Sequence, residues 1–411
     1  MSEATLINPD PGFARSVLEC GGDQLRKCFQ CATCSVTCEL APSDHPFPRK
    51  EMIWAQWGLE DRLTSDPDVW LCHQCGECSV RCPRDARPGD VLAALRKLTV
   101  RHHSAPRIFW DWVNRPAYLP LMVLLPALLL ALALLVRDPV TAALGIEPHV
   151  AEGMEYATLF PHWLLISFFS FFLGLSVLAS AVGLVRFWRA MSSGEGDHAG
   201  QRSIVSSLFT VLRQILTHRQ FRVCASASSP LPAHLSMFYG FAVLFAVSGW
   251  AVVLIYVINP LLQSPLPYPF PFWDPAKILA NLGALFFLGG AGWAIVRRIR
   301  GDVGVGTTTA ADWIFLGIVA GVGVTGLASE TLRFVESPTI GFPVYFVHLV
   351  LAFMLLIYLP YSKFAHIFYR TTALVYADRA GRLTPRAESA GTIGASSPQE
   401  STSDRNQLTA A

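Results

Sequence analysis

Residues 28–38 read CFQCATCSVTC, and residues 72–82 repeat the same spacing as CHQCGECSVRC. Each run is C-x2-C-x2-C-x3-C, the thiolate pattern of bacterial ferredoxins that hold two [4Fe-4S] clusters. In such ferredoxins three cysteines of a run bind one cluster and the fourth binds the other. We therefore predict two clusters that exchange their fourth ligand. The predicted ligands are Cys28, Cys31, Cys34 and Cys82 for cluster 1, and Cys72, Cys75, Cys78 and Cys38 for cluster 2.

Structural zinc is the alternative for these cysteines, because zinc sites also use C-x2-C pairs. Four cysteines packed into each short run, with Pro83 directly after the second run, favour the ferredoxin pattern. Cys20 and Cys224 lie outside the repeat, and we expect them to be ordinary thiols. The first residues lack the basic and apolar segments of a signal peptide, so we expect these thiols to remain in a reducing compartment.

The remainder of the chain has the composition of a membrane protein. The whole sequence is 52% apolar and 15% charged, with a mean hydropathy of +0.40. Long uncharged stretches of about 20 residues are typical of membrane-spanning helices. We predict six spanning helices, at about residues 116–137, 159–187, 234–258, 276–296, 312–333 and 343–368. No basic run is interleaved with aromatic residues, which argues against a nucleic-acid-binding protein.

The predicted fold class is multidomain. An α-helical ferredoxin-like domain with two [4Fe-4S] clusters covers residues 1–110, and an all-α six-helix transmembrane cytochrome b bundle covers residues 111–375. A tail poor in apolar residues follows at 376–411, and we expect it to be disordered. Lys and Arg concentrate after helices two, four and six, which places the ferredoxin-like domain and the tail on the cytoplasmic side. The expected location is the inner membrane of a bacterium or archaeon.

Four histidines lie on the predicted helices, where a polar side chain is costly and therefore suggests a function. His348 and His366 are 18 residues apart, which is five helical turns and about 27 Å along one continuous helix. Imidazole is a common axial ligand of haem iron. Matching depths pair His234 with His366 at a proximal haem b, and His162 with His348 at a distal haem b, with a single haem as the alternative. We expect His218 to be a loop residue or a phospholipid contact.

Several segments of the bundle resemble a known family. Residues 307–312 (TTTAAD), 347–351 (VHLVL) and 359–367 (LPYSKFAHI) closely resemble the cytochrome b subunit of respiratory nitrate reductase, over roughly residues 200–370. The resemblance implies two haems b with ligands at His348 and His366, and a proximal partner at His234. That family has a further histidine where this sequence has Leu244, so the distal haem needs another ligand, for which His162 is the candidate.

The front half resembles the C subunit of heterodisulfide reductase. Joined to a nitrate-reductase-like cytochrome b, it resembles the QmoC family of quinone-interacting membrane-bound oxidoreductases. This implies electron transfer between menaquinone or ubiquinone and cytoplasmic flavin/iron-sulfur subunits (QmoA- and QmoB-like), serving adenylylsulfate reductase in dissimilatory sulfur metabolism. The candidate quinone-site residues are Lys277 and Asp274, titratable groups at the outer start of helix four.

Three alternatives remain open at this point. They are a heterodisulfide reductase-type electron-input subunit, a zinc-binding membrane anchor without redox activity, and a subunit of a nitrate-type or other terminal reductase. The glycine run at 289–292 lacks the strand and helix of a dinucleotide site, and we expect it to serve close helix packing.

Overall fold

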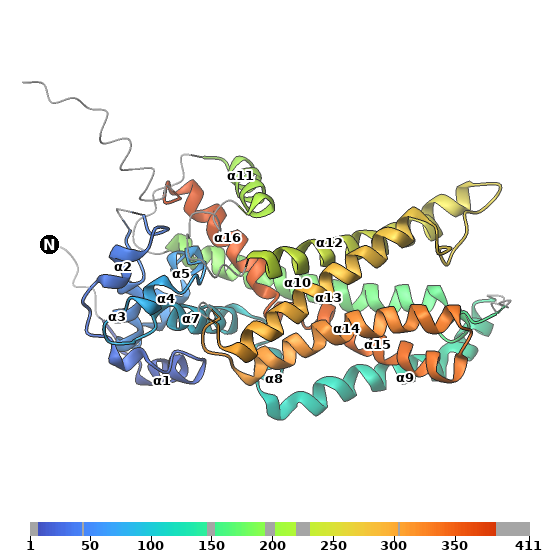
Figure 1. The fold of residues 1–411 in the computed structure, drawn as a ribbon, viewed down its shortest axis with the longest axis horizontal. Helices are drawn as coiled ribbons and strands as arrows, with labels where there is room; N and C mark the ends of the chain where they lie inside the picture. Colours follow the sequence, from blue (N-terminus) through green and yellow to red (C-terminus); the bar gives the residue numbers. More distant parts are fainter. Residues whose placement is uncertain are drawn as a thin grey trace, which may run out of the picture.

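A computed structural model describes residues 7–42, 45–145, 153–193, 202–218, 231–302 and 305–383. Within these ranges the chain forms helices and contains no strand. Figure 1 shows two parts: a bundle of long helices, and a cluster of short helices at one end of it. We call residues 7–114 the cysteine-rich module. Its helices are α1 (Pro11–Glu19), α2 (Thr33–Thr37), α3 (Arg49–Trp57), α4 (Glu60–Thr64), α5 (Asp68–Leu71), α6 (Glu77–Val80), α7 (Pro88–His103) and α8 (Arg107–Asn114).

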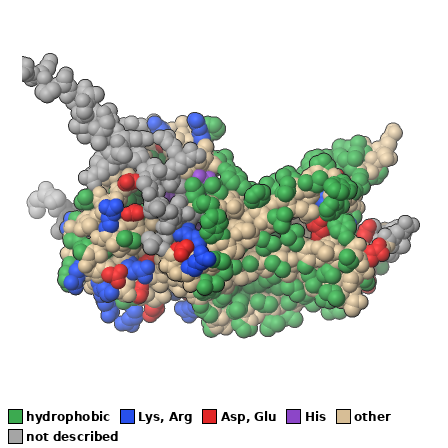
Figure 2. All heavy atoms as spheres, viewed as in Figure 1, with side chains coloured by type: hydrophobic (Ala, Val, Ile, Leu, Met, Phe, Trp, Pro, Cys, Tyr) green, Lys and Arg blue, Asp and Glu red, His purple; other side chains and the backbone are tan. Residues whose placement is uncertain are grey.

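The bundle contains six helices that are long and apolar enough to cross a membrane. They are α9 (Leu119–Ala143), α10 (His162–Ser193), α12 (Leu231–Val253), α13 (Pro275–Arg300), α14 (Ala310–Phe334) and α15 (Pro338–Ile357). Apolar side chains cover the surface of the bundle, whereas charged side chains gather at the end that carries the module (Figure 2). Exposed apolar surface of this extent suits contact with lipid. The predicted helical fold, with a domain of short helices before six candidate spanning helices, is confirmed within the described residues.

The last predicted helix, 343–368, is wrong as a single helix. Helix α15 ends at Ile357, a 3-10 turn spans Leu359–Tyr361, and α16 (Ala365–Arg379) then begins. Pro360 explains the break, because proline has no N–H to continue the helical hydrogen bonds and its ring clashes with the preceding turn. His348 and His366 therefore lie on different helices, and not on one face of a continuous helix.

Two further differences concern segments that the sequence analysis places on the cytoplasmic side. The stretch between the second and third spanning helices contains α11 (Ile204–Thr217), an amphipathic helix that packs on α16. Helix α16 itself continues to Arg379, past the predicted start of the tail at residue 376. The rest of the predicted tail, from residue 384, lies outside the described residues.

Helices α12 and α13 approach each other through glycines. A Cβ atom at Gly290 would lie 2.7 Å from the backbone nitrogen of Met237, and one at Gly240 would lie 2.6 Å from the backbone nitrogen of Phe287. Such distances are too short for any side chain, so glycine is required here. Close packing at the 289–292 run is confirmed at Gly290, whereas Gly289 and Gly292 face open space.

Candidate iron-sulfur and haem sites

The two cysteine runs fold in the same way. Gln30 and Ala32 have positive φ angles of 61° and 68°, and the equivalent residues of the second run, Gln74 and Gly76, have 54° and 89°. Left-handed backbone is unusual for residues other than glycine. It turns the chain sharply between successive cysteines. Both loops also direct donors at sulfur: the Gln74 backbone N–H lies 3.3 Å from Cys72 Sγ, and Gln30 Nε2 lies 3.4 Å from Cys28 Sγ.

Cysteines from the two runs are neighbours in the fold. Cys28 lies close enough to Cys31 and Cys82 for their charges to affect its thiol, and Cys38 is in the same position relative to Cys72 and Cys75. Burial raises the pKa of the Cys38 thiol to about 12, and the nearby Cys72 adds to the effect. Such thiols ionise only when a metal stabilises the thiolate. These neighbours are the ones that the predicted ligand sets require, while the sets themselves stay a prediction.

A cavity of about 450 Å³ lies where the module meets the bundle. This volume is within the usual range for cofactor sites. His234 of α12 and His366 of α16 both line it, as does His73, the residue after Cys72. Six cationic side chains and one carboxylate, Asp312, also line the cavity. The cations are Arg96, Lys97, Arg297, Arg298, Lys363 and Arg370.

Helix α16 connects this cavity to the second cysteine run. Arg370, one helical turn after His366, donates from Nη2 to His73 Nε2 at 2.7 Å. Tyr369 stacks on Trp70 with ring centroids 5.6 Å apart. On the module side, Arg96 Nη2 donates to the backbone oxygen of Cys72 at 2.8 Å. The helix that carries His366 therefore packs directly on the residues around Cys72.

A buried ion-pair centre fastens the module to the bundle. Asp312, in the first turn of α14, lies 2.8 Å from Lys363 Nζ and 3.5 Å from Lys97 Nζ of the module. The loop before α14 adds hydrogen bonds to α7, the helix that carries Lys97. Lys97 Nζ lies 3.2 Å from Thr309 Oγ1, and Thr307 Oγ1 donates to Asp90 Oδ2 at 3.0 Å. We call Asp90, Lys97, Lys363 and residues 305–312 the docking seam.

His218 has a different setting from the one predicted. It is buried at the end of α11, and its ring centroid lies 5.5 Å from that of His234. The prediction of a loop or phospholipid contact missed this packing. Only the apolar periodicity of residues 204–217 pointed to a helix there.

The distal histidine pair stays a prediction. His348 Nδ1 lies 3.1 Å from Thr325 Oγ1 of α14, and the His162 ring lies 5.2 Å from the Tyr268 ring. Neither His162 nor His348 lines the cavity that holds His234 and His366.

The candidate quinone-site residues have distinct partners. Asp274 caps α13 by accepting from the Ala276 N–H at 2.8 Å, whereas Lys277 Nζ lies 2.8 Å from Glu330 Oε2 of α14. Asn281 Nδ2 donates to the other oxygen of Glu330 at 3.0 Å. The sequence analysis missed Glu330, because this residue lies near the end of the fifth predicted helix and its partner Lys277 lies on another helix.

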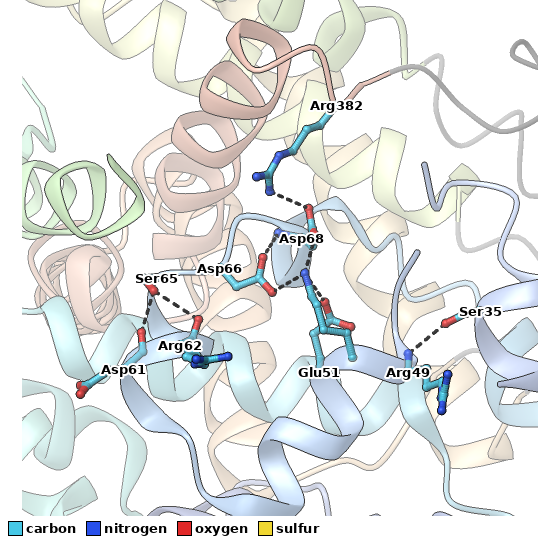
Figure 3. Close-up of polar contacts among 10 residues, drawn as sticks. Ser35, Arg49, Glu51, Asp61, Arg62, Ser65, Asp66, Asp68 and Arg382 are labelled. Carbon is cyan, nitrogen blue, oxygen red and sulfur yellow. Dashed lines mark hydrogen bonds and ion pairs between the residues drawn. The ribbon is translucent and has the colours of Figure 1, made fainter. Parts of the chain in front are cut away.

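A separate acidic cluster is buried in the module (Figure 3). Lys50 Nζ lies 2.7 Å from Asp68, 3.0 Å from Asp66 and 3.3 Å from Glu51. Arg382 approaches Asp68 at 3.9 Å from beyond α16. Burial raises the pKa values of Glu51 and Asp68. The cluster joins the module to the end of α16.

The sequence matches two family models. Residues 24–86 match the 4Fe-4S dicluster domain, and residues 114–388 match citrate utilization protein B. The second match covers about two thirds of the chain. No solved structure matches the chain.

Three relatives illustrate the similarity. Citrate utilization protein B of Escherichia coli is 26% identical over 74% of this chain and 80% of its own length. The C subunit of the H2:CoB-CoM heterodisulfide, ferredoxin reductase of Methanothermobacter marburgensis is 39% identical over 22% of this chain. The match covers 48% of that relative, so this chain spans about half of the relative's length. The E subunit of the dihydromethanophenazine:CoB–CoM heterodisulfide reductase of Methanosarcina barkeri is 26% identical over 49% of this chain and 76% of its own length.

The fold, the cysteine runs and these relatives together define a class. The chain is homologous to electron-transfer subunits of heterodisulfide reductase-like oxidoreductase complexes, with a 4Fe-4S dicluster domain joined to membrane-spanning helices. Within this class it belongs to the citrate utilization protein B family.

Proposed function

We propose that this chain is the membrane subunit of a quinone-interacting oxidoreductase. It passes electrons between a membrane quinone and cytoplasmic flavin/iron-sulfur subunits. When bound, haem b and two [4Fe-4S] clusters supply one-electron redox chemistry. The cysteine ligand sets are those predicted from the repeat, with Cys38 and Cys82 exchanged between the runs.

The observation that carries the proposal is the cavity between His234, His366 and His73. His234 and His366, on separate helices, would hold a haem b, because imidazole is a common ligand of haem iron and helical bundles commonly bind cofactors between facing helices. The net positive lining suits the two propionate carboxylates of haem, which form strong hydrogen bonds with Arg and Lys. His218, packed on His234, helps to fix the orientation of that ring. The contact between Arg370 and His73 supports transfer from this cavity toward Cys72.

The proposal includes a second haem b at His348, with His162 as its partner. The partly buried ion pair between Lys277 and Glu330 supports a polar site at that end of the bundle, because charged groups inside a membrane commonly mark ion or substrate sites. Quinone chemistry takes up and releases protons, and Lys277 and Glu330 provide titratable groups, with Asn281 hydrogen-bonded to Glu330. Asp274 serves as a helix cap in this account.

Two partner systems compete. The likeness to quinone-interacting oxidoreductases supports adenylylsulfate reductase and sulfur metabolism. The family match over two thirds of the chain supports instead a partner system of citrate utilization, as the name of the relative indicates. The longer coverage favours the second system. The test adds either adenylylsulfate or citrate to cell extracts that contain the membranes, and follows which of the two changes the redox state of the haem.

The central experiment counts cofactors in purified protein and its histidine variants. We expect about eight iron atoms per chain bound with acid-labile sulfide, in addition to haem iron, and a haem b spectrum. His234→Leu and His366→Leu should each lose the same haem, while His162→Leu and His348→Leu should lose the other. Colourless anaerobic preparations would refute the proposal, and a His162→Leu variant with full haem content would refute the distal pairing.

A further inference from the structure

We propose that Phe29, Val36 and Val80, with the basic residues beside them, form the docking surface for an acidic cytoplasmic redox subunit. This inference rests on the proposed function, and it identifies where the partner binds. We call these three apolar residues, together with Arg26, Lys27, Arg81 and Arg84, the docking patch. All seven side chains are exposed.

The first argument is the internal repeat. The two cysteine runs are offset by 44 residues, so Phe29 is equivalent to His73, and Val36 is equivalent to Val80. His73 makes an interface: it accepts a hydrogen bond from Arg370 of α16, beside the haem cavity. Phe29 lies under the guanidinium of Arg84 at 4.3 Å, but its side chain remains 69% exposed. The equivalent positions thus differ: His73 of the second run contacts the bundle, whereas Phe29 of the first run faces solvent. Val36 and Val80 are exposed in both runs.

The second argument is the exposure of large apolar side chains next to a metal ligand. Val36 and Val80 are 68% and 65% exposed, and they lie on α2 and α6, which pack against each other. Cys31 is also exposed, in the same loop as Phe29. Figure 1 shows α2 at the end of the module that lies away from the bundle. A redox partner seated there would meet the cluster that is farther from the membrane.

The third argument is charge, which selects the kind of partner. Four exposed basic residues lie within four positions of Phe29 or Val80 in the sequence, and Arg84 lies over the Phe29 ring. Two acidic residues pair with them, Asp85 with Lys27 at 3.5 Å and Glu77 with Arg81 at 3.3 Å, so the basic residues outnumber these acidic partners by four to two. An apolar centre with a charged rim is the usual composition of a protein interface. A basic rim attracts an acidic partner and speeds its association.

The redox step at the docking patch transfers one electron at a time. A flavin or iron-sulfur centre of the partner would lose one electron, and the cluster that Cys28, Cys31, Cys34 and Cys82 would hold would gain it. No covalent bond forms or breaks. A partner without a redox centre would therefore not satisfy the proposal.

The test uses the purified full-length chain with its cofactors, and flavodoxin as a small acidic flavoprotein probe. Binding of oxidised flavodoxin is measured by biolayer interferometry, and haem reduction by reduced flavodoxin is followed by absorbance. We expect Arg84→Glu and Phe29→Ser each to weaken binding and slow haem reduction by about tenfold. The charge-matched control Arg15→Glu, on α1 at the opposite side of the module, should match the wild type (Figure 1).

A small dye distinguishes docking of a partner from electron transfer within the chain. Reduced methyl viologen should reduce the haem of every variant at rates within about twofold of the wild type, because a small dye needs no protein-sized interface. If reduced methyl viologen fails to reduce the haem of the wild type, the proposed function is refuted. Flavodoxin binding would still test the docking patch in that case. Equal flavodoxin binding by Arg84→Glu and Arg15→Glu would refute the docking patch. The docking patch would also be refuted if flavodoxin showed no salt-sensitive binding to the wild type. It would likewise be refuted if Phe29→Ser changed the oligomeric state, because the surface would then bind a second copy of the chain.

Discussion

Glu51 has no exposed surface, and at the residue scale it makes the stability of the module depend on pH. Its ordinary pKa is 4.5, and burial raises the pKa well above that value in the folded chain. The folded state therefore retains a proton that the unfolded state releases as the pH rises. The stabilising effect is complete below pH 4.5 and is lost as the pH rises toward the raised pKa.

We predict that Glu51→Gln stabilises the module at pH 8 and weakens this pH dependence. Gln keeps the shape of the side chain but cannot ionise, so the cost of a buried negative charge disappears. The expected gain is about 1 kcal/mol, or a rise of about 2–4 °C in the midpoint of thermal bleaching of the cluster absorbance. The two proteins should converge at pH 5. An equal gain for the exposed control Glu39→Gln would contradict the argument.

Single cysteines test the exchange of ligands between the runs. We predict that Cys38→Ser alters the cluster of the second run, and that Cys82→Ser alters the cluster of the first run. The reason is that each of these residues lies beside cysteines of the other run. Electron paramagnetic resonance of the reduced variants should show one changed signal each, and different ones. If Cys38→Ser alters the cluster of its own run instead, the predicted ligand sets are wrong.

Helix packing is the argument at the scale of elements. Gly290 allows α13 to approach Met237 of α12, and α12 carries His234. We predict that Gly290→Leu pushes the two helices apart and removes haem from the cavity, since overpacking costs about 1–3 kcal/mol and displaces the ligand. The matched controls Gly289→Leu and Gly292→Leu point into open space and should keep their haem. The pyridine haemochrome assay measures the difference. Haem loss from all three variants would indicate a general effect on α13.

The elements also show how far the sequence could predict the structure. Hydropathy located six spanning helices because lipid contact requires long apolar stretches, and it missed the end of α15 because Pro360 is itself apolar. The helical break depends on a missing N–H, which composition does not register. The packing of His218 on His234, and the pairing of Lys277 with Glu330, depend on contacts between distant segments. Spacing in the sequence carries no information about them.

At the scale of the whole molecule, the docking seam fixes the module against the bundle. Asp312 is the centre of the seam, because it is buried and faces both Lys97 of the module and Lys363. Removing the buried carboxylate leaves two partly exposed cations without their counter-charge, because the side chains of Lys97 and Lys363 are 22% and 38% exposed. We therefore expect a cost of about 2 kcal/mol, below the roughly 3–5 kcal/mol of a fully buried pair. The seam also borders the cavity, since all three of these side chains line it. Opening the seam would therefore expose the proposed haem site to water.

We predict that Asp312→Asn loosens the module while the module itself stays folded. A loss of about 2 kcal/mol in the free energy of opening makes amide hydrogen exchange roughly 30-fold faster in residues 305–312, with the amides of α7 beyond Lys97 little changed. The matched control is Asp302→Asn, because Asp302 pairs with Arg297 at 3.2 Å but is 37% exposed. A partly exposed pair contributes at most about 1 kcal/mol, so exchange should change less than tenfold. Equal exchange in the two variants would show that the loop, and not the Asp312 ion pairs, holds the module on the bundle.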